Sequence, residues 1–310
     1  MSWFSGYRDE WKEIIETVAR EYGRSNLLVE KDTIQSIFLS QLSKSDLPFV
    51  FKGGTSLSKA YNLIDRFSED IDLSMSRKLT QSEKKDSKTQ IINIAESIGL
   101  VLSNPDDVQS KYSYNLYVFK YDSLFSDRPM EMVVETSYYQ NAYPTEQHDI
   151  GCFVGKFCKE RNIALTIPFD AIDFTMNVQS KERTFIEKIF AVCDYRIQNN
   201  PDRESRHLYD ICKLISFVKL DKELVKLIDI VRNDRMTSKS NPSAQLKYNI
   251  PEILDEIIQS RFYESDYKNI TQKLLFEDVD YDYAVSNGIL KVSKSDAFLY
   301  NAERAESTIK

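Results

Sequence analysis

The chain has 310 residues, enough for one large domain or two ordinary ones with a substantial buried core. Hydrophobic residues make up 42% of it and charged residues 29%, and its 8 Gly and 8 Pro argue against a disordered or fibrous chain. The formal net charge of -7 provides no overall attraction to nucleic acid, so any contact with RNA or DNA requires a local basic patch.

The cysteines, the histidines and the length of the apolar runs bear on metal binding, redox state and membrane insertion. The four cysteines include no Cys-x-x-Cys pair, and with only two histidines a zinc site is not expected. We interpret the cysteines as reduced thiols of an intracellular protein. No apolar run approaches the ~18 residues that cross a membrane, and residues 1–10 lack the basic and apolar stretches of a signal peptide. We therefore expect a cytoplasmic protein with no membrane partner.

Hydrophobic periodicity divides the chain into a mixed first part and a helical second part. In chain order, the first part contains helices over 9–21 and 30–43, a strand over 49–51, a helix carrying Leu57 to Ile64, a strand ending at Leu73, a helix over 80–102, strands over 112–121 and 130–139, a helix near 150–161 and a strand near 170–178. The second part contains helices over 181–198, 203–219, 222–235, 250–264 and 266–276. A boundary near residue 179 gives an α/β domain over 1–179 and a helical domain over 180–310.

Two aspartates on the strand that ends at Leu73 provide the first chemical signal. Alternate side chains of a strand face the same way, with Cα atoms roughly 6.6–6.8 Å apart, so Asp70 and Asp72 can converge on one cation or a close pair. Carboxylate oxygens suit Mg²⁺, which keeps waters and substrate phosphates in its shell. Two metal ions about 3.5–4 Å apart can clamp the attacking and leaving oxygens of an in-line displacement. Alone, an Asp-x-Asp pair is weak evidence, because such pairs also occur on solvated strand faces.

The turn before these aspartates provides the second signal, Gly53-Gly54-Thr55-Ser56. Two glycines let backbone N–H groups approach a phosphate closely, and the following helix N-terminus adds the positive end of its dipole. Ser56 can add a hydroxyl, and Lys59 lies one turn into the helix, where it can meet anionic oxygens. The same sequence also fits a plain tight turn followed by a capped helix.

Together, the runs from Gly53 to Lys59 and from Arg66 to Leu73 resemble the first motif of the AbiEii/AbiGii toxin family, which belongs to the polymerase-β-like nucleotidyltransferases. The resemblance implies an α+β fold, with a nucleotidyltransferase core of a mixed sheet flanked by helices and a helical C-terminal domain. It also implies a set of nucleotide-binding residues, namely Gly53, Gly54, Thr55, Ser56, Lys59, Arg66, Ser68 and Lys188.

The family pattern further implies a third carboxylate on a later strand. Glu135 fits best, since apolar residues flank it in a strand, and Glu131 has the same parity and is the runner-up. Such a carboxylate can complete the shell of a metal held by Asp70 and Asp72, or take the proton from an attacking hydroxyl. An edge-strand glutamate that faces water is the plain alternative.

Two catalytic residues are implied on the helices after residue 179. Lys188 matches the family lysine and can reach triphosphate oxygens as a point charge, although without the resemblance it would be an ordinary surface lysine. Asp210 matches the family aspartate, and it can instead form a simple i, i+4 pair with Arg206. We interpret the neighbouring His207 as a helix-surface histidine.

The resemblance implies a toxin of a toxin–antitoxin or abortive phage-infection system, with a cognate antitoxin encoded nearby. The expected reaction transfers a nucleotide from a nucleoside triphosphate, with Mg²⁺ or Mn²⁺, to an RNA acceptor such as the 3′ end of tRNA. Scattered basic residues such as Arg232 and Arg235 are candidates for RNA contact, and a solvated surface explains them equally well. Two alternatives stay open: a GTP- or NTP-binding module without transfer activity, and nucleotidylation of a protein side chain.

Overall fold

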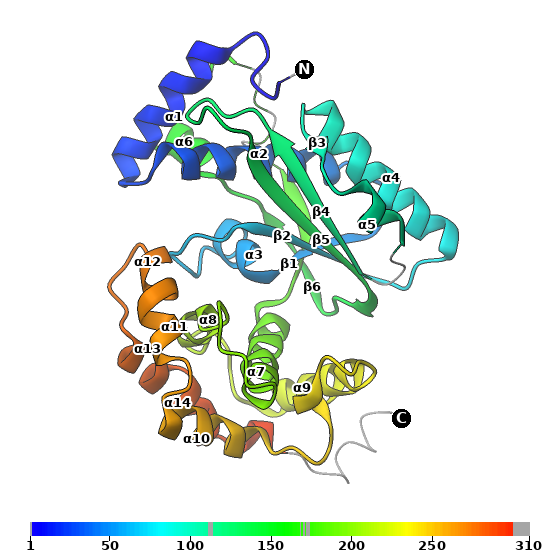
Figure 1. The fold of residues 1–310 in the computed structure, drawn as a ribbon, viewed down its shortest axis with the longest axis vertical. Coiled ribbons are helices and arrows are strands. Elements are labelled where there is room, and N and C mark those ends of the chain that lie inside the picture. Colours follow the sequence, from blue (N-terminus) through cyan, green and yellow to red (C-terminus); the bar gives the residue numbers. More distant parts are fainter. Residues whose placement is uncertain (1, 111–113, 168, 170, 172–173, 300–310) are drawn as a thin grey trace. The chain divides into compact units, whose positions relative to one another are not determined.

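The chain folds into two compact units (Figure 1). The computed structural model describes residues 2–110, 114–167, 169, 171 and 174–299. The first unit contains Met1–Tyr61 and Ser68–Gln179, and the second contains Asn62–Phe67 and Ser180–Lys310. The chain therefore leaves the first unit at Tyr61, packs a short segment into the second unit, and returns at Ser68.

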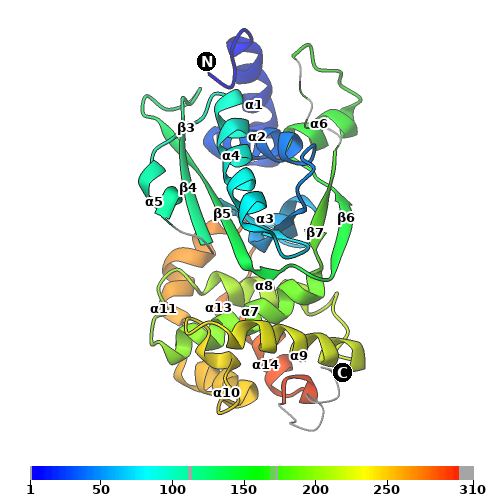
Figure 2. The same cartoon turned by 90° about the vertical axis from the view of Figure 1, so that its right-hand side faces the viewer.

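A mixed seven-stranded sheet forms the centre of the first unit, in the order β3-β4-β5-β2-β1-β7-β6 (Figure 2). The strands are β1 (Phe49–Lys52), β2 (Asp70–Met75), β3 (Val101–Leu102), β4 (Tyr114–Tyr121), β5 (Met130–Asn141), β6 (Thr145–Asp149) and β7 (Thr175–Gln179). β2 pairs in parallel with β5 and antiparallel with β1, and β1 pairs in parallel with β7. β2 is thus an inner strand with a neighbour on each side.

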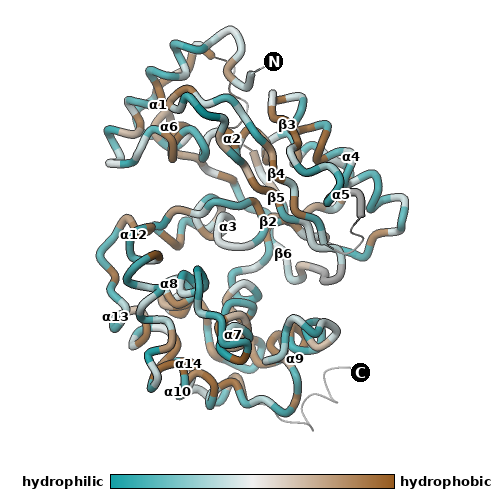
Figure 3. Tube along the Cα trace, viewed as in Figure 1, coloured by the Kyte–Doolittle hydropathy of each residue, from teal (hydrophilic) through white to brown (hydrophobic). Residues whose placement is uncertain are grey.

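Apolar side chains of the helices cover one face of this sheet. The helices of the first unit are α1 (Arg8–Tyr22), α2 (Asn26–Leu42), α3 (Gly53–Lys59), α4 (Gln81–Ser97), α5 (Pro105–Ser110) and α6 (Phe153–Arg161). Phe38 from α2 and Ile91 from α4 pack with Phe51, Ile71 and Val134 from three strands in one buried cluster. Hydrophobic stretches along α2, β4 and β5 are visible in Figure 3. This packing decides which side chains of each strand are left for the other face.

A second apolar cluster joins helices α1, α2 and α6. Trp11 and Ile15 of α1 pack with Val29 of α2 and with Val154 and Phe157 of α6. All five side chains are buried. Helix α2 therefore contributes to both clusters, and its position is fixed from two sides.

The described elements of the second unit are helices. Its helices are α7 (Lys181–Ile197), α8 (Arg206–Leu214), α9 (Lys222–Met236), α10 (Ile250–Ser260), α11 (Glu264–Asp266), α12 (Gln272–Leu274), α13 (Tyr281–Asn287) and α14 (Ile289–Ser293), with a π-helical turn over Tyr267–Thr271. Phe185 and Ile189 of α7 are fully buried. Across the described ranges, we find no helix with the length and apolar character that crossing a membrane requires.

Most predicted elements are present, and two of the differences coincide with contacts between segments far apart in the chain. Strand β6 was not predicted because its sequence, Thr-Glu-Gln-His-Asp, lacks apolar alternation, and it forms by antiparallel pairing with β7 at the edge of the sheet. Helix α3 ends at Lys59, well before Ile64, and the backbone N–H of Gly151 donates to the Lys59 carbonyl at 2.8 Å. The strands predicted from 112 and from 170 begin in part outside the described residues.

Candidate active site

Asp70 and Asp72 lie on one face of β2, as the alternation of the sequence predicts. Both are half-buried, whereas Ile71 and Leu73 between and after them are buried in the apolar cluster on the opposite face. Burial of the two apolar side chains leaves the aspartates no other direction, because successive residues of a strand point to opposite faces. The face of the sheet opposite α2 and α4 therefore carries two adjacent carboxylates.

Glu135 joins this face from the neighbouring strand β5. In the parallel register of β2 and β5, Asp72 is the partner of Glu135 and Asp70 is the partner of Val133. Glu131, the runner-up, is exposed and lies four residues earlier on β5, before the point at which β2 begins. Register and burial thus bring Glu135, not Glu131, beside the aspartates.

Tyr114 of β4 is a neighbour of these carboxylates that the sequence did not reveal. It lies diagonally across from Glu135 on the same face, because Leu116 is the register partner of Glu135. Its phenolic O–H donates to the Glu135 carboxylate. Burial raises the pKa of Tyr114 far above its usual range, and the charges of Glu135, Asp72 and Asp70 raise it further. A single aromatic residue in an aromatic-rich strand has no sequence signature that would have marked it.

Lys31 of α2 brings a cation to the same acidic surroundings. Its pKa is lowered by burial, and the carboxylates of Glu69, Asp70 and Glu131 oppose this shift by attraction. Sequence reasoning missed Lys31, because one lysine within an apolar helix carries no motif.

Gly53 leaves room for the Asp72 carboxylate. Its φ of 74° lies in the left-handed region, which glycine adopts without strain. A Cβ at this position would lie 2.9 Å from the Cβ of Asp72 and would overlap its carboxylate group. The glycine that the sequence suggested for phosphate contact therefore has a second physical reason, which is close packing against the aspartate.

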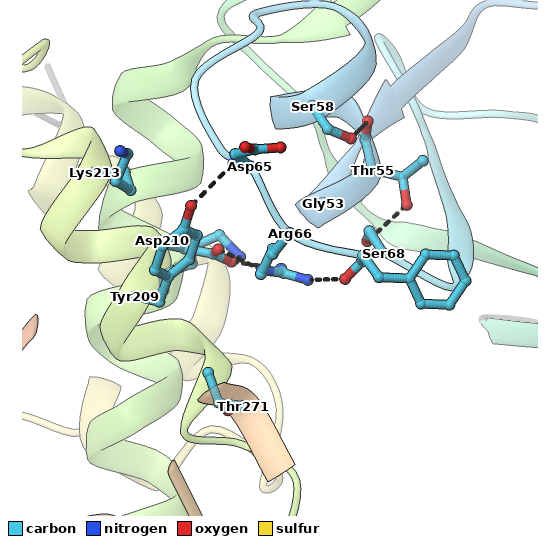
Figure 4. Close-up of polar contacts among 12 residues, drawn as sticks. Gly53, Thr55, Ser58, Asp65, Arg66, Ser68, Tyr209, Asp210, Lys213 and Thr271 are labelled. Atoms are coloured by element: carbon cyan, nitrogen blue, oxygen red, sulfur yellow. Dashed lines mark hydrogen bonds and ion pairs between the residues drawn. The ribbon is translucent and has the colours of Figure 1, made fainter. Parts of the chain in front are cut away.

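The hydroxyl groups of the Gly53 turn are engaged within the first unit (Figure 4). Thr55 Oγ1 donates to the backbone carbonyl of Asp70 and lies 2.8 Å from Ser68 Oγ. Ser56 Oγ, which is fully buried, donates to the Gly53 carbonyl at 2.9 Å. These contacts hold the turn and the start of β2 together, and Gly54 stays a proposed phosphate-binding residue on sequence grounds.

Lys59 is committed to an internal ion pair. Its Nζ donates to the carboxylate and the carbonyl of Asp32 and, at 2.8 Å, to Ser36 Oγ. The residue is only 8% exposed. All three N–H donors are thus used inside the first unit, so a phosphate contact by Lys59 would require these hydrogen bonds to be exchanged.

Arg66, Lys188 and Asp210 form a buried cluster within the second unit (Figure 4 shows the Arg66–Asp210 contact). Arg66 Nε and Nη2 each donate to one carboxylate oxygen of Asp210 at 2.7 Å, and Lys188 Nζ donates to Oδ2 at 2.7 Å. Asp210 is fully buried and Lys188 is 6% exposed. Asp210 therefore pairs with Arg66 and Lys188, unlike the simple i, i+4 pair with Arg206, and Lys188 is not a surface lysine.

The charges of this cluster explain its protonation. Burial alone would raise the pKa of Asp210, but Arg66 and Lys188 outweigh it and hold the pKa well below its usual range. Burial lowers the pKa of Lys188, and attraction to Asp210 opposes that shift. Removal of either partner of such a pair leaves an uncompensated charge in the interior.

His207 is largely covered, which corrects its interpretation as a surface histidine. Only 16% of its side chain is exposed, its Nε2 lies 3.2 Å from Glu204, and its ring stacks on Tyr195. Burial lowers the pKa of His207 to about 4, the nearby Lys188 ammonium adds to the decrease, and Glu204 opposes it. The imidazole is therefore neutral at physiological pH.

The donor set around Asp70 and Asp72 fits a magnesium ion of the kind that shares its shell with a substrate. Within the described part of the chain, no three His, Cys, Asp or Glu side chains are gathered as a ready-made metal cage. Mg²⁺ is commonly bound by one or two carboxylates plus substrate phosphates, and β2 presents two half-buried carboxylates, of which Asp72 lies in the space that Gly53 leaves.

Comparisons with known proteins identify the family and a similar fold. A family model described as "Nucleotidyl transferase AbiEii toxin, Type IV TA system" matches residues 37–287. MenT4, a nucleotidyltransferase toxin from Mycobacterium tuberculosis H37Rv, has a similar fold, with a TM-score of 0.53, 18% identity, and coverage of 95% of this chain and 92% of that chain. A Helicobacter pylori protein whose structure is titled "putative nucleotidyltransferase" aligns over 91% of this chain and 98% of its own, at 18% identity and a TM-score of 0.49. No curated protein matches the sequence.

Replacement of Gly53 by alanine should destabilise the first unit more than the same change at Gly6. Both glycines have positive φ, 74° and 83°, so each substitution costs ~1–2 kcal/mol of backbone energy. At Gly6 the new Cβ meets nothing within 4 Å, whereas at Gly53 it meets Asp72, which should add about 1–3 kcal/mol. Urea unfolding of Gly53→Ala and Gly6→Ala measures the difference, and equal losses would refute close packing of Asp72 against Gly53.

Neutral His207 should make the stability of the protein depend on pH. The folded-state pKa of about 4 lies below that of an unfolded histidine, so the unfolded chain takes up the proton first and stability falls as the pH drops from 7 towards 4. Between pH 7 and pH 5, the wild type should lose about 2 kcal/mol more than His207→Gln. Denaturant unfolding of the wild type and of His207→Gln at both pH values measures this difference. Parallel losses in wild type and His207→Gln would show that His207 is protonated equally easily in both states.

Proposed function

Because this chain belongs to the family of AbiEii nucleotidyl transferase toxins of type IV toxin–antitoxin systems, we propose that it transfers a nucleotide from a nucleoside triphosphate to RNA, with the 3′ end of tRNA as acceptor. The protein is a nucleotidyltransferase by this membership. The proposed chemistry depends on one observation, the carboxylate face on which Asp72 and Glu135 are register partners and Asp70 is their neighbour.

The carboxylates have distinct tasks in the proposed reaction. Asp70 and Asp72 would hold Mg²⁺ or Mn²⁺, which when bound neutralises the developing charge on the triphosphate and polarises the α-phosphorus. Glu135 accepts the proton of the attacking hydroxyl, and its hydrogen bond from Tyr114 keeps the carboxylate oriented on this face. The acceptor oxygen then bonds to the α-phosphorus as the bond to pyrophosphate breaks.

Phosphate binding is proposed for the Gly53-Gly54 turn and for Lys188, on the family resemblance. The space of the missing Cβ at Gly53 is taken by the Asp72 carboxylate, so a phosphate would meet the backbone N–H groups of the turn and not this space. Lys188 is 6% exposed and its ammonium is held by Asp210, so, as for Lys59, a phosphate contact would require part of this covering to open. A restrained ammonium loses less entropy on meeting an anion than a mobile surface lysine does.

The RNA acceptor is supported by the family and only weakly by charge. Two of the basic residues that the sequence suggested for RNA contact have internal roles: Arg232 is 2% exposed, and Arg235 pairs with Asp194. The first alternative, an NTP-binding module without transfer, is less favoured, because binding alone needs no third carboxylate beside Asp72. Nucleotidylation of a protein side chain uses the same chemistry and is separated from RNA transfer by experiment.

The context of a type IV system implies an antitoxin as partner, and we propose a role in abortive phage infection inside the cytoplasm. Growth arrest on expression, relieved by the adjacent antitoxin gene, would support this setting. The biochemical proposal does not depend on it.

Transfer from each of four α-³²P nucleoside triphosphates to total RNA should depend on Asp72. With Mg²⁺, wild type should label RNA from a favoured nucleotide, and Asp72→Asn should reduce labelling by about 100-fold or more, because the variant loses a metal ligand and not an outer contact. Asp149→Asn, at the exposed end of β6, is the matched control that keeps activity. Gel separation of RNA and protein after the reaction measures both possible acceptors.

Three other results of this labelling experiment would contradict the proposed reaction. Label on protein with none on RNA would replace RNA by a protein acceptor. No transfer, with intact triphosphate binding, would favour the binding module. Equal labelling by wild type and Asp72→Asn would refute a role for Asp72, and hence for this face of β2, in the reaction.

A further inference from the structure

At Asp70, strand β2 is paired with β5 on one side but no longer with β1 on the other. The antiparallel register of β1 and β2 runs from Phe49 and Met75 to Lys52 and Asp72. Asp70 lies beyond that register and has a strand partner in Val133 of β5. It is also the third residue after the chain re-enters the first unit at Ser68. The backbone at such a position needs contacts from outside the sheet if the point from which the Asp70 side chain starts is to be fixed.

Gln35 supplies one of these contacts from α2. Its side chain is 2% exposed, and its Nε2 donates to the backbone carbonyl of Glu69, the residue directly before Asp70, at 3.0 Å. Helix α2 is itself packed in both apolar clusters of the unit, so the amide is presented from a rigid element. The backbone just before Asp70 is thereby anchored to α2.

Thr55 supplies the second contact from α3. Its Oγ1 donates to the carbonyl of Asp70 itself, and this hydroxyl is also hydrogen-bonded with Ser68 at 2.8 Å. Thr55 is 1% exposed. A hydroxyl has one proton to donate, and a carbonyl can only accept, so the proton of Thr55 is committed to Asp70.

We propose that Gln35 and Thr55 are positioning residues that hold Asp70 in the direction required for metal binding, with Ser68 as support for Thr55. The proposal rests on the proposed function, because it takes Asp70 as a metal ligand. The two side chains take the place of the strand partner that β1 does not provide at this level. These contacts act through the backbone that carries the Asp70 side chain, and the loss of contacts that orient a metal ligand typically lowers metal affinity or activity by ~10–100-fold.

This role differs from nucleotide binding by Thr55, which the sequence suggested. A nucleotide-binding hydroxyl affects the KM for the triphosphate. A residue that directs Asp70 affects metal binding and kcat and leaves that KM nearly unchanged.

The chain offers closely matched variants. Thr55→Val removes the hydroxyl and keeps the branched shape, while Thr55→Ser keeps the hydroxyl and tests rescue. Gln35→Met removes the amide donor at similar length. Thr33→Val is the control, since Thr33 is also fully buried on α2 and its Oγ1 donates only along its own helix, to the Val29 carbonyl at 2.7 Å.

Binding of Mn²⁺ alone, followed by electron paramagnetic resonance, is the readout that does not need catalysis. We expect Thr55→Val and Gln35→Met each to weaken Mn²⁺ binding and to lower kcat for RNA labelling by about 10-fold. The KM for the triphosphate should change less than about threefold, Thr55→Ser should recover most of the loss, and Thr33→Val should match wild type.

Three results would overturn the positioning role. These are equal Mn²⁺ binding by wild type and Thr55→Val, a loss confined to the KM for the triphosphate, and an equal loss in Thr33→Val. A wild type that binds Mn²⁺, loses it in Thr55→Val, and transfers no nucleotide would support the positioning role while refuting the proposed reaction.

Discussion

The alternation of side chains along β2 is the constraint on which the functional face depends. Ile71 and Leu73 are buried against α2 and α4, and this burial turns Asp70 and Asp72 to the opposite face. Burying two large aliphatic side chains stabilises the fold by roughly 3–6 kcal/mol, and this gain is lost if the strand turns its other face to the core. The apolar core thus sets the direction of the acidic groups. A shift of one residue in the register would turn Ile71 and Leu73 out of the core and the aspartates into it.

Repulsion between the carboxylates must then be offset locally. Lys31 contributes a cation, and Tyr114 donates a hydrogen bond to Glu135. Gly53 gives Asp72 space that any other residue would fill. A divalent cation is the further positive charge that such an acidic face attracts, which is the reason that metal binding by Asp70 and Asp72 is proposed.

Sequence reasoning predicted the strand, the shared face of Asp70 and Asp72, and the parity of Glu135, because each follows from local alternation. It could not choose between Glu135 and Glu131, since that choice depends on the register between β2 and β5, two segments far apart in the chain. It also assigned Lys59 an outward role, because the partner Asp32 belongs to another helix. Gln35 has no motif, and its importance comes from one tertiary contact with the residue before Asp70.

The segment Asn62–Phe67 lies in the chain between two elements of the first unit and yet packs in the second. The backbone N–H of Phe67 donates to the Leu274 carbonyl, and Arg66 neutralises the fully buried Asp210. The helical unit is therefore not a separable module: a gene fragment that begins at residue 180 would encode a buried aspartate without its arginine. Recombination in evolution, or a truncation in the laboratory, can exchange this half only together with a piece of sequence that lies inside the other.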